Sequence, residues 1–224
     1  MVRTAMILAA GRGERMGELT KNTPKPLLVH KGKTLLERHL ENLAAAGFSD
    51  VVINTSYLSS KIRDYVGKGS NWNLRVSFSE EETVLETAGG IRKALHLIGS
   101  DPFVVINADI YTQFDYSALL SLRLQDNVDA HLFLTENPEH NIDGDFSLMS
   151  NHLVSNEKKI NAKTFTGIAI YKKNFFQNME LGKHLKLAPY LIDAIRKRRV
   201  SGQRLNAIWM DIGTPERLRC LDQL

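Results

Sequence analysis

Residues 5–16 read AMILAAGRGERM, an apolar run that leads directly into a loop containing Gly11 and Gly13. Glycines let the backbone of such a loop approach a ligand closely. The loop also carries two cations, Arg12 and Arg15. Backbone N–H groups and fixed positive charge at the end of a strand form a binding site for a polyphosphate. The segment therefore predicts a strand followed by a phosphate-binding loop.

Two familiar glycine motifs do not fit this loop. The chain lacks the Gly-x-x-x-x-Gly-Lys-Ser/Thr pattern of a P-loop. The dinucleotide fingerprint needs a third glycine where Met16 stands, and Gly17 comes one place late. Residues 30–33, about 20 positions further on, contain no acidic side chain to bind a ribose. We therefore expect a different mode of nucleotide binding.

A third cation follows the loop. Lys25 stands between Pro24 and Pro26. Each proline ring fixes its own φ, and Pro26 also favours an extended conformation at Lys25. The ammonium group is thus held on a stiffened backbone, which suits contact with a phosphate.

Strand and helix patterns alternate through the first half, which predicts a sheet of parallel strands covered by helices on both faces. The expected strands are residues 5–9, 51–54, 74–78 and 103–106, and the expected helices are 35–46, 60–66 and 90–98. The second half is less regular. It predicts strands at 130–135 and 166–171, a hairpin of 145–149 with 152–155, and a helix at 187–197. We expect one domain, residues 1–224.

Two aspartates follow apolar runs that lie far apart in the sequence. Asp109 comes after residues 103–106, and Asp211 lies just before the last helix. Ligands bind parallel sheets beyond the carboxyl ends of the strands, so both carboxylates are expected at one edge. Mg²⁺ commonly takes one or two carboxylates together with phosphate oxygens. The pair predicts a Mg²⁺ site, and the lack of a histidine cluster argues against catalytic zinc.

The composition excludes other classes of function. The chain has 29 basic and 25 acidic residues, and its basic runs at 172–173 and 196–199 lack the interleaved aromatics of a base-stacking surface. We expect no nucleic-acid partner. Apolar segments fall short of the ~20 residues that span a bilayer, and no signal-peptide pattern is present. We expect a cytoplasmic protein without a membrane partner, and the sequence leaves its oligomeric state open.

The loop and several later segments together resemble the sugar-nucleotide pyrophosphorylases, which join a sugar 1-phosphate to a nucleoside triphosphate. The segments that carry this resemblance are residues 23–27, 86–91, 107–109, 144–146, 165–168, 185–189 and 209–214. The resemblance implies a Rossmann-like three-layer α/β/α fold with a mixed, mainly parallel sheet, a GT-A-like nucleotidyltransferase fold. It is greatest to the uridylyltransferases that act on N-acetylmuramate α-1-phosphate in bacterial peptidoglycan recycling. UTP and that sugar phosphate are the implied substrates, with Mg²⁺ as cofactor.

The resemblance also implies roles for particular residues. Catalysis would rest on Arg15 for the leaving pyrophosphate, Lys25 for the oxygens around the α-phosphorus, and Asp109 with Asp211 for the metal. The remaining nucleotide contacts would come from Ala10, Gly11, Gly13, Glu14, Glu80, Gly89 and Asn107. The sugar contacts would come from Asp145, Thr166, Gly167 and Lys186.

Other functions remain open at this stage. A mannose or glucose 1-phosphate guanylyl-, thymidylyl- or uridylyltransferase would use the same loop and the same metal site. A nucleotide-sugar-dependent glycosyltransferase often binds its metal through Asp-x-Asp, whereas Asn107 occupies the first of those positions here. A non-catalytic nucleotide-sugar sensor would be expected to lose a metal ligand or a phosphate-binding cation, and the chain keeps both kinds.

Overall fold

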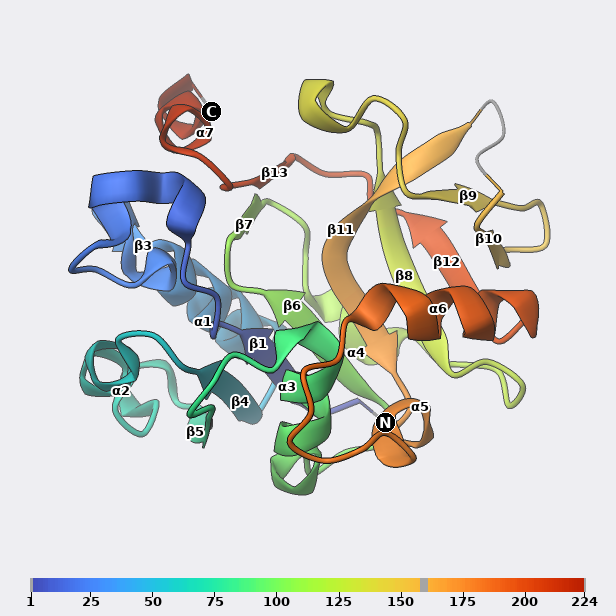
Figure 1. The fold of residues 1–224 in the computed structure, drawn as a ribbon, viewed down its shortest axis with the longest axis horizontal. Helices are drawn as coiled ribbons and strands as arrows, with labels where there is room; N and C mark the ends of the chain where they lie inside the picture. Colours follow the sequence, from blue (N-terminus) through green and yellow to red (C-terminus); the bar gives the residue numbers. More distant parts are fainter. Residues whose placement is uncertain (1, 158–160, 224) are drawn as a thin grey trace.

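The computed structural model describes residues 2–157 and 161–223. Within these residues a nine-stranded mixed sheet forms the central layer, with helices packed on both of its faces (Figure 1). The expected α/β/α class is therefore confirmed. No helix in this part of the chain is both long enough and apolar enough to cross a membrane.

The first half of the sheet is parallel. Its strands are β1 (Thr4–Leu8), β4 (Asp50–Thr55), β5 (Arg75–Glu80) and β6 (Phe103–Asn107), in the spatial order β6-β1-β4-β5. Leu8 is in register with Asn54 on one side and with Asn107 on the other. The carboxyl ends of three strands thus meet at one edge, directly before the glycine-containing loop.

The second half is built around β11 (Ala162–Tyr171), which runs antiparallel to β6, to β8 (Ala130–Thr135) and to β9 (Phe146–Leu148). The predicted hairpin is present, because β10 (Val154–Ser155) pairs antiparallel with β9. A further strand, β12 (Val200–Arg204), runs parallel to β8 and was not expected from the sequence. Its pattern, Val-Ser-Gly-Gln-Arg, has little of the apolar content that marks a buried strand.

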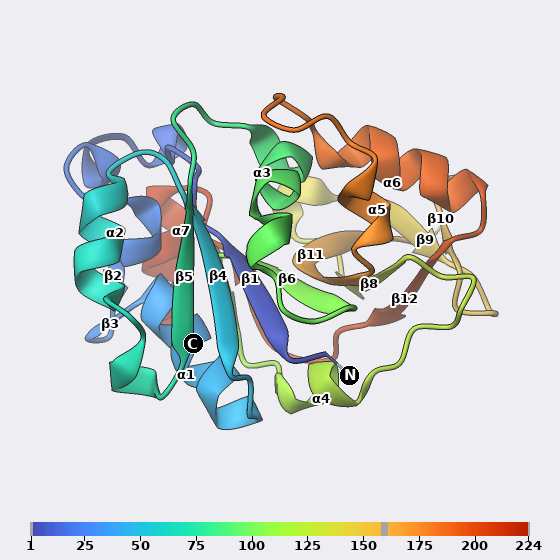
Figure 2. The same cartoon turned by 90° about the horizontal axis from the view of Figure 1, so that it is seen from below.

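The helices divide between the two faces of the sheet (Figure 2). One face carries α1 (Leu35–Ala46), α2 (Ser59–Val66) and α4 (Ser117–Ser121), and the other carries α3 (Glu86–Ala94), α5 (Asn174–Gln177) and α6 (Leu187–Arg196). Helix α1 has the predicted bounds because its ends are marked locally. Thr34 and Glu37 form a capping box at its start, and Gly47 ends it in the left-handed conformation at φ 93°.

Helix α3 starts at Glu86, four residues before the predicted start at Gly90, and ends at Ala94. The glycines at 89 and 90 lie inside the helix and not at its boundary. Glycine is needed at both positions because neighbouring groups leave no room for a side chain. A Cβ on Gly89 would lie 2.3 Å from the carbonyl oxygen of Lys183. These glycines therefore serve close packing and do not interrupt the helix.

Shorter elements complete the fold. Two small antiparallel ladders pair β2 (Val29–His30) with β3 (Lys33–Thr34) and β7 (Ile110–Thr112) with β13 (Trp209–Asp211). The helix α7 (Pro215–Cys220) follows β13. The 3₁₀ turns are η1 (Glu14–Thr20), η2 (Lys25–Leu27), η3 (Ser70–Trp72), η4 (Leu95–Leu97), η5 (Glu139–Asn141) and η6 (Leu221–Gln223).

Candidate active site

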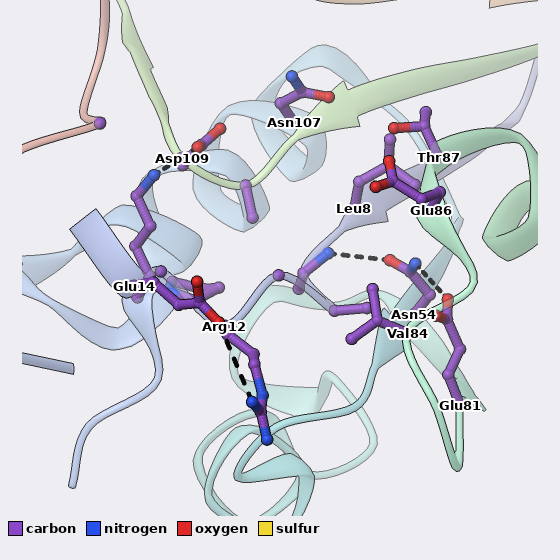
Figure 3. Close-up of a pocket in the computed structure, with 18 of the residues that line it drawn as sticks. Leu8, Arg12, Glu14, Asn54, Glu81, Val84, Glu86, Thr87, Asn107 and Asp109 are labelled. Carbon is purple, nitrogen blue, oxygen red and sulfur yellow. Dashed lines mark hydrogen bonds and ion pairs between the residues drawn. The ribbon is translucent and has the colours of Figure 1, made fainter. Parts of the chain in front are cut away.

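A cavity of about 570 Å³ opens at the carboxyl ends of β1, β4 and β6 (Figure 3). It brings together most of the nucleotide and catalytic residues predicted from the sequence. Those that line it are Ala10, Gly11, Gly13, Glu14, Arg15, Lys25, Asn107 and Asp109. Leu8, Asn54, Glu81, Val84, Glu86 and Thr87 are among its other lining residues.

The loop after β1 is shaped by Gly13. This residue has φ 68°, in the left-handed region that favours glycine, and a Cβ there would lie 3.1 Å from the Cβ of Lys25. The Gly13 carbonyl accepts hydrogen bonds from the amide of Met16 at 2.9 Å and from the hydroxyl of Thr20 at 3.0 Å. Gly13 thus lets the loop fold tightly over the lysine that follows it.

Lys25 is buried, and its ammonium donates to Asp109 Oδ2 at 2.5 Å. Pro24 and the turn that begins at Lys25 hold its backbone, as expected from the two flanking prolines. Asp109 follows β6 directly, so the pair joins the loop to the end of a central strand. An ammonium and a carboxylate are therefore held together on the wall of the cavity.

The chain segment that carries Asp211 lies next to the segment that carries Asp109. Asp211 pairs with Ile110 in the β7–β13 ladder, and the amide of Ile212 donates to the Asp109 carbonyl at 2.7 Å. The Asp211 carboxylate accepts from Arg217 Nη1 at 2.6 Å and lies 2.7 Å from His140 Nε2. It is not among the residues that line the cavity. The sequence predicted that the two aspartates converge, but not that Arg217 and His140 hold one of them.

The donor set suits Mg²⁺. Two carboxylates on adjoining segments, each facing a cation, are the oxygen ligands that Mg²⁺ takes alongside phosphate oxygens and water. No group of three or more His, Cys, Asp or Glu side chains that could hold a metal occurs among residues 2–157 and 161–223. Such a group would be expected for a closed all-protein metal site, so a metal here would depend on ligand phosphates to complete its coordination.

Glu80 and Glu81 lie differently with respect to the cavity. Glu80, which was predicted to contact the base, is exposed and accepts from Ser59 Oγ and Arg63 Nη1 at 2.6 Å. Glu81 is buried and lines the cavity instead. Glu80, predicted to contact the base, therefore does not line the cavity, whereas its neighbour Glu81 does.

Glu81 belongs to a buried hydrogen-bonded chain that the sequence did not reveal (Figure 3). Its carboxylate accepts from Asn54 Nδ2 at 2.7 Å and from the amide of Leu85 at 2.9 Å, and burial raises its pKa. Asn54 Oδ1 in turn accepts from the amide of Ala9 at 2.9 Å. Gly90 leaves room for this chain, because a Cβ there would lie 2.6 Å from Glu81 Oε1. The available signal was Asn54 itself, a polar residue in an otherwise apolar strand.

Gly89 faces away from the cavity. Its amide donates to the Leu185 carbonyl at 3.1 Å, and the amide of Ala88 donates to the same oxygen at 3.0 Å. Gly89 therefore packs α3 against the segment that leads into α6, and the structure does not place it among the nucleotide contacts predicted from the sequence.

A second cavity, of about 500 Å³, adjoins the first on the α6 side and shares Leu8, Glu86, Thr87 and Asn107 with it. It contains three of the four predicted sugar residues, Asp145, Gly167 and Lys186. Thr166 does not line it. That side chain is fully buried, and its hydroxyl donates to the Phe133 carbonyl at 2.8 Å.

Gly167 and Asp145 shape the junction between the two cavities. Gly167 has φ 77°, and a Cβ on it would lie 2.6 Å from Asn107 Nδ2, so glycine is required for Asn107 to occupy its place. The Asp145 carboxylate accepts from the amide of Phe165 at 2.8 Å and from Asn141 Nδ2 at 3.3 Å. Asp145 thus braces β11 where its pairing with β8 is irregular.

The comparison with family models matches residues 4–222 to the nucleotidyl transferase model. The N-acetylmuramate alpha-1-phosphate uridylyltransferase of Neisseria meningitidis serogroup B is 47% identical over 219 residues, which cover 96% of this chain and 95% of that protein. A mannose-1-phosphate guanyltransferase of Hypocrea jecorina is 26% identical over 221 residues, and the chain spans only 61% of its length.

A crystal structure of a Bacillus anthracis protein assigned as a glucose-1-phosphate thymidylyltransferase, in complex with sucrose, superimposes with a TM-score of 0.85. The superposition covers 98% of this chain and 94% of that one, at 18% sequence identity. At that identity the likeness concerns the fold alone.

Proposed function

Because the chain belongs to the nucleotidyl transferase family, we propose that it joins UTP to N-acetylmuramate α-1-phosphate and releases UDP-N-acetylmuramate and pyrophosphate. The observation that carries the reaction type is the pair of adjoining cavities that meet at Asn107. One contains the loop cations and Asp109, and the other contains three of the four predicted sugar residues. Two substrates can therefore lie side by side with their phosphates near Lys25. The whole chain, residues 1–224, acts as one domain in this proposal.

The reaction is an in-line displacement at the α-phosphorus of UTP. A phosphate oxygen of the sugar phosphate attacks, a P–O bond forms, and the bond to the departing pyrophosphate breaks. The attacking oxygen is already anionic, so the reaction needs no general base. The barrier arises from bringing negative groups together, and positioning with fixed positive charge lowers it.

The loop cations supply that charge. Arg15 is exposed at the mouth of the cavity and takes the oxygens of the leaving pyrophosphate. Lys25 is buried deeper, beside Asp109, and takes the oxygens around the α-phosphorus. Its pairing with Asp109 keeps the ammonium aimed at that point before the phosphate arrives. Burial strengthens the Lys25 interaction because water is largely excluded there.

Asp109 and Asp211 would hold Mg²⁺. When bound, the ion neutralises charge on the phosphates of both substrates. The chain contributes the two carboxylates and the cations that balance them, Lys25 for Asp109 and Arg217 for Asp211.

Glu81 would read the base. The uracil ring carries one imide N–H donor, and a carboxylate accepts such a donor in addition to the bonds it already makes. Both Glu81 oxygens already accept one hydrogen bond from the protein, so the group is held in a fixed orientation on the cavity wall. This assignment replaces the contact expected at Glu80.

The likeness to the Hypocrea jecorina guanyltransferase makes mannose 1-phosphate with GTP the second candidate pair. Pyrophosphate release with Mg²⁺, measured across a grid of nucleoside triphosphates and sugar 1-phosphates, separates the two. Turnover restricted to UTP with N-acetylmuramate 1-phosphate supports the proposal. Turnover with GTP and mannose 1-phosphate keeps the mechanism but replaces the substrates, and silence across the grid overturns the enzyme assignment.

A further inference from the structure

One cation on the wall of the second cavity is left without a partner. Among the lining residues that the structure describes, Lys186 is the single cation, and its ammonium makes no hydrogen bond or ion pair there. The two carboxylates of this cavity are engaged elsewhere. Asp145 accepts from Phe165 and Asn141, and Glu86 lies 3.7 Å from His184 Nε2. The lysine therefore lines the cavity as an exposed cation that pairs with neither carboxylate.

Its place in the fold adds to that charge. Lys186 is the N-cap of α6, at φ −72° and ψ 142°, and no side chain caps the helix or supplies an acid to its first turn. The N-terminus of a helix is its positive end, so a lysine there is electrostatically unfavourable. A lysine ammonium also cannot accept hydrogen bonds from the free N–H groups of the first turn. Leu187 and Ala188, the next two residues, also line the cavity. A bound anion would offset the positive charge of both the lysine and the helix N-terminus.

A second observation marks the same cavity as a ligand site. Tyr171 lines it and is fully buried, and its hydroxyl has no hydrogen-bond partner among the described residues. A buried hydroxyl without a partner is unfavourable unless a ligand supplies one. Apolar side chains form most of the remaining wall, including Val105, Phe146 and Leu191. The cavity thus presents the unpaired Lys186 ammonium and two already engaged carboxylates on a largely apolar wall, beside the buried Tyr171 hydroxyl.

We propose that Lys186 binds the lactyl carboxylate of N-acetylmuramate 1-phosphate and so distinguishes this substrate from N-acetylglucosamine 1-phosphate. This inference rests on the proposed function. The two sugars differ only by the lactyl ether, which adds one carboxylate and one methyl group. The phosphate is drawn to the cations of the first cavity, near Lys25, so the carboxylate of the same molecule is free to reach the second cavity. The apolar wall there suits the lactyl methyl and the acetyl group.

The test compares Lys186→Met with the wild-type enzyme on both sugar phosphates at saturating UTP. For N-acetylmuramate 1-phosphate we expect kcat/KM to fall about 10- to 100-fold, mainly through KM, the usual effect of losing a hydrogen bond to a charged group. For N-acetylglucosamine 1-phosphate we expect a change of less than about twofold. Lys186→Arg should restore most of the loss. Binding of the two UDP-sugars, measured by calorimetry, should show the same selectivity without turnover.

Lys183→Met is the matched control. Lys183 lies three positions earlier, is exposed, pairs with Glu180 and does not line the cavity. We expect it to retain wild-type kinetics with both sugars. The melting temperature of Lys186→Met should equal or exceed that of the wild type, because the variant removes a cation from the positive end of a helix. A lysine that only supported the fold would lower it.

Equal losses with both sugars would overturn the inference, since they would assign Lys186 to the phosphate that the sugars share. Unchanged kinetics with N-acetylmuramate 1-phosphate would overturn it as well. Both of these outcomes leave the proposed function standing. A wild-type enzyme that releases no pyrophosphate from UTP with N-acetylmuramate 1-phosphate would instead overturn the proposed function, and this inference with it.

Discussion

The ammonium of Lys25 lies 2.5 Å from a carboxylate oxygen of Asp109, across 84 positions of sequence. The pair closes the phosphate-binding loop onto the end of β6. It also places a cation beside a metal-ligand candidate, so each group orients the other. Both groups are then in position to contact the phosphates as these arrive.

Replacing Lys25 with Met should leave the protein folded but lower kcat about 10²- to 10³-fold, the typical effect of removing one group that stabilises developing charge. Steady-state pyrophosphate release measures the loss, and circular dichroism checks the fold. Lys21→Met serves as the control because Lys21 is exposed and pairs only with Glu18. A Lys25→Met enzyme with near-wild-type kcat would remove Lys25 from the mechanism.

Replacing Asp211 with Asn should raise the Mg²⁺ concentration that gives half-maximal velocity, because one of the two anionic ligands is lost. A Mg²⁺ titration at saturating substrates measures the shift, and Mn²⁺ binding followed by electron paramagnetic resonance measures it without turnover. Asp222→Asn is the control, since Asp222 pairs with His30 and is not among the cavity-lining residues. An unchanged Mg²⁺ requirement in Asp211→Asn would show that this carboxylate is no ligand.

Gly167→Ala should raise KM for both substrates and lower stability by about 1–3 kcal/mol, the cost of a strained backbone residue. The new Cβ would lie 2.6 Å from the Asn107 amide, which stands between the two cavities. Gly182→Ala isolates that contact. Gly182 also has φ 77°, but nothing lies within 4 Å of its Cβ position, so this variant suffers the backbone strain alone. Equal kinetic effects in the two variants would contradict the role given to Asn107.

Stability should fall as the solution becomes acidic. Burial lowers the pKa of His39 to about 4, and its Nδ1 lies 2.8 Å from the Tyr116 hydroxyl. Between pH 6.5 and pH 4 the unfolded chain binds a proton that the folded chain excludes. The contribution of neutral His39 to the free energy of unfolding is therefore fully present above pH 6.5. It is lost as pH falls through this window, and the total loss is on the order of 3 kcal/mol.

Urea unfolding at a series of pH values measures the slope of the free energy of unfolding against pH. His39→Asn should flatten it only in part, because burial also lowers the pKa of His131 to about 4. His96→Asn is the control, since His96 is exposed and should leave the slope unchanged. A wild-type slope near zero across the window would contradict the assignment.

Local signals allowed much of the fold to be predicted. The bounds of α1 follow from Thr34 and Gly47, which act within a few residues of the helix ends. The loop and Lys25 were recognisable because glycines, prolines and cations occur together in a short segment. Strand β12 was missed because its burial comes from its neighbours and not from its own composition.

The candidate site was less predictable where partners are distant in sequence. Glu80 and Glu81 are adjacent, and successive residues at the end of a strand point to opposite faces of the sheet. Glu80 turns toward α2, where Arg63 lies, and Glu81 turns toward Asn54 and the cavity. Sequence alone does not say which face holds the cavity. In the same way, nothing local identifies Arg217 and His140 as the partners of Asp211.

The ladder between β7 and β13 has a consequence for biosynthesis. It holds Asp211 next to Ile110, and Gly213, two residues further on, lines the cavity together with the loop at residues 10–15. Translation therefore produces the loop at residues 10–15 long before it produces Asp211. The nascent chain can shape this loop early, but Asp211 and its partner Arg217 can join Asp109 only after translation has passed Arg217. Truncations before residue 209 should, for the same reason, leave Asp109 without its neighbouring carboxylate.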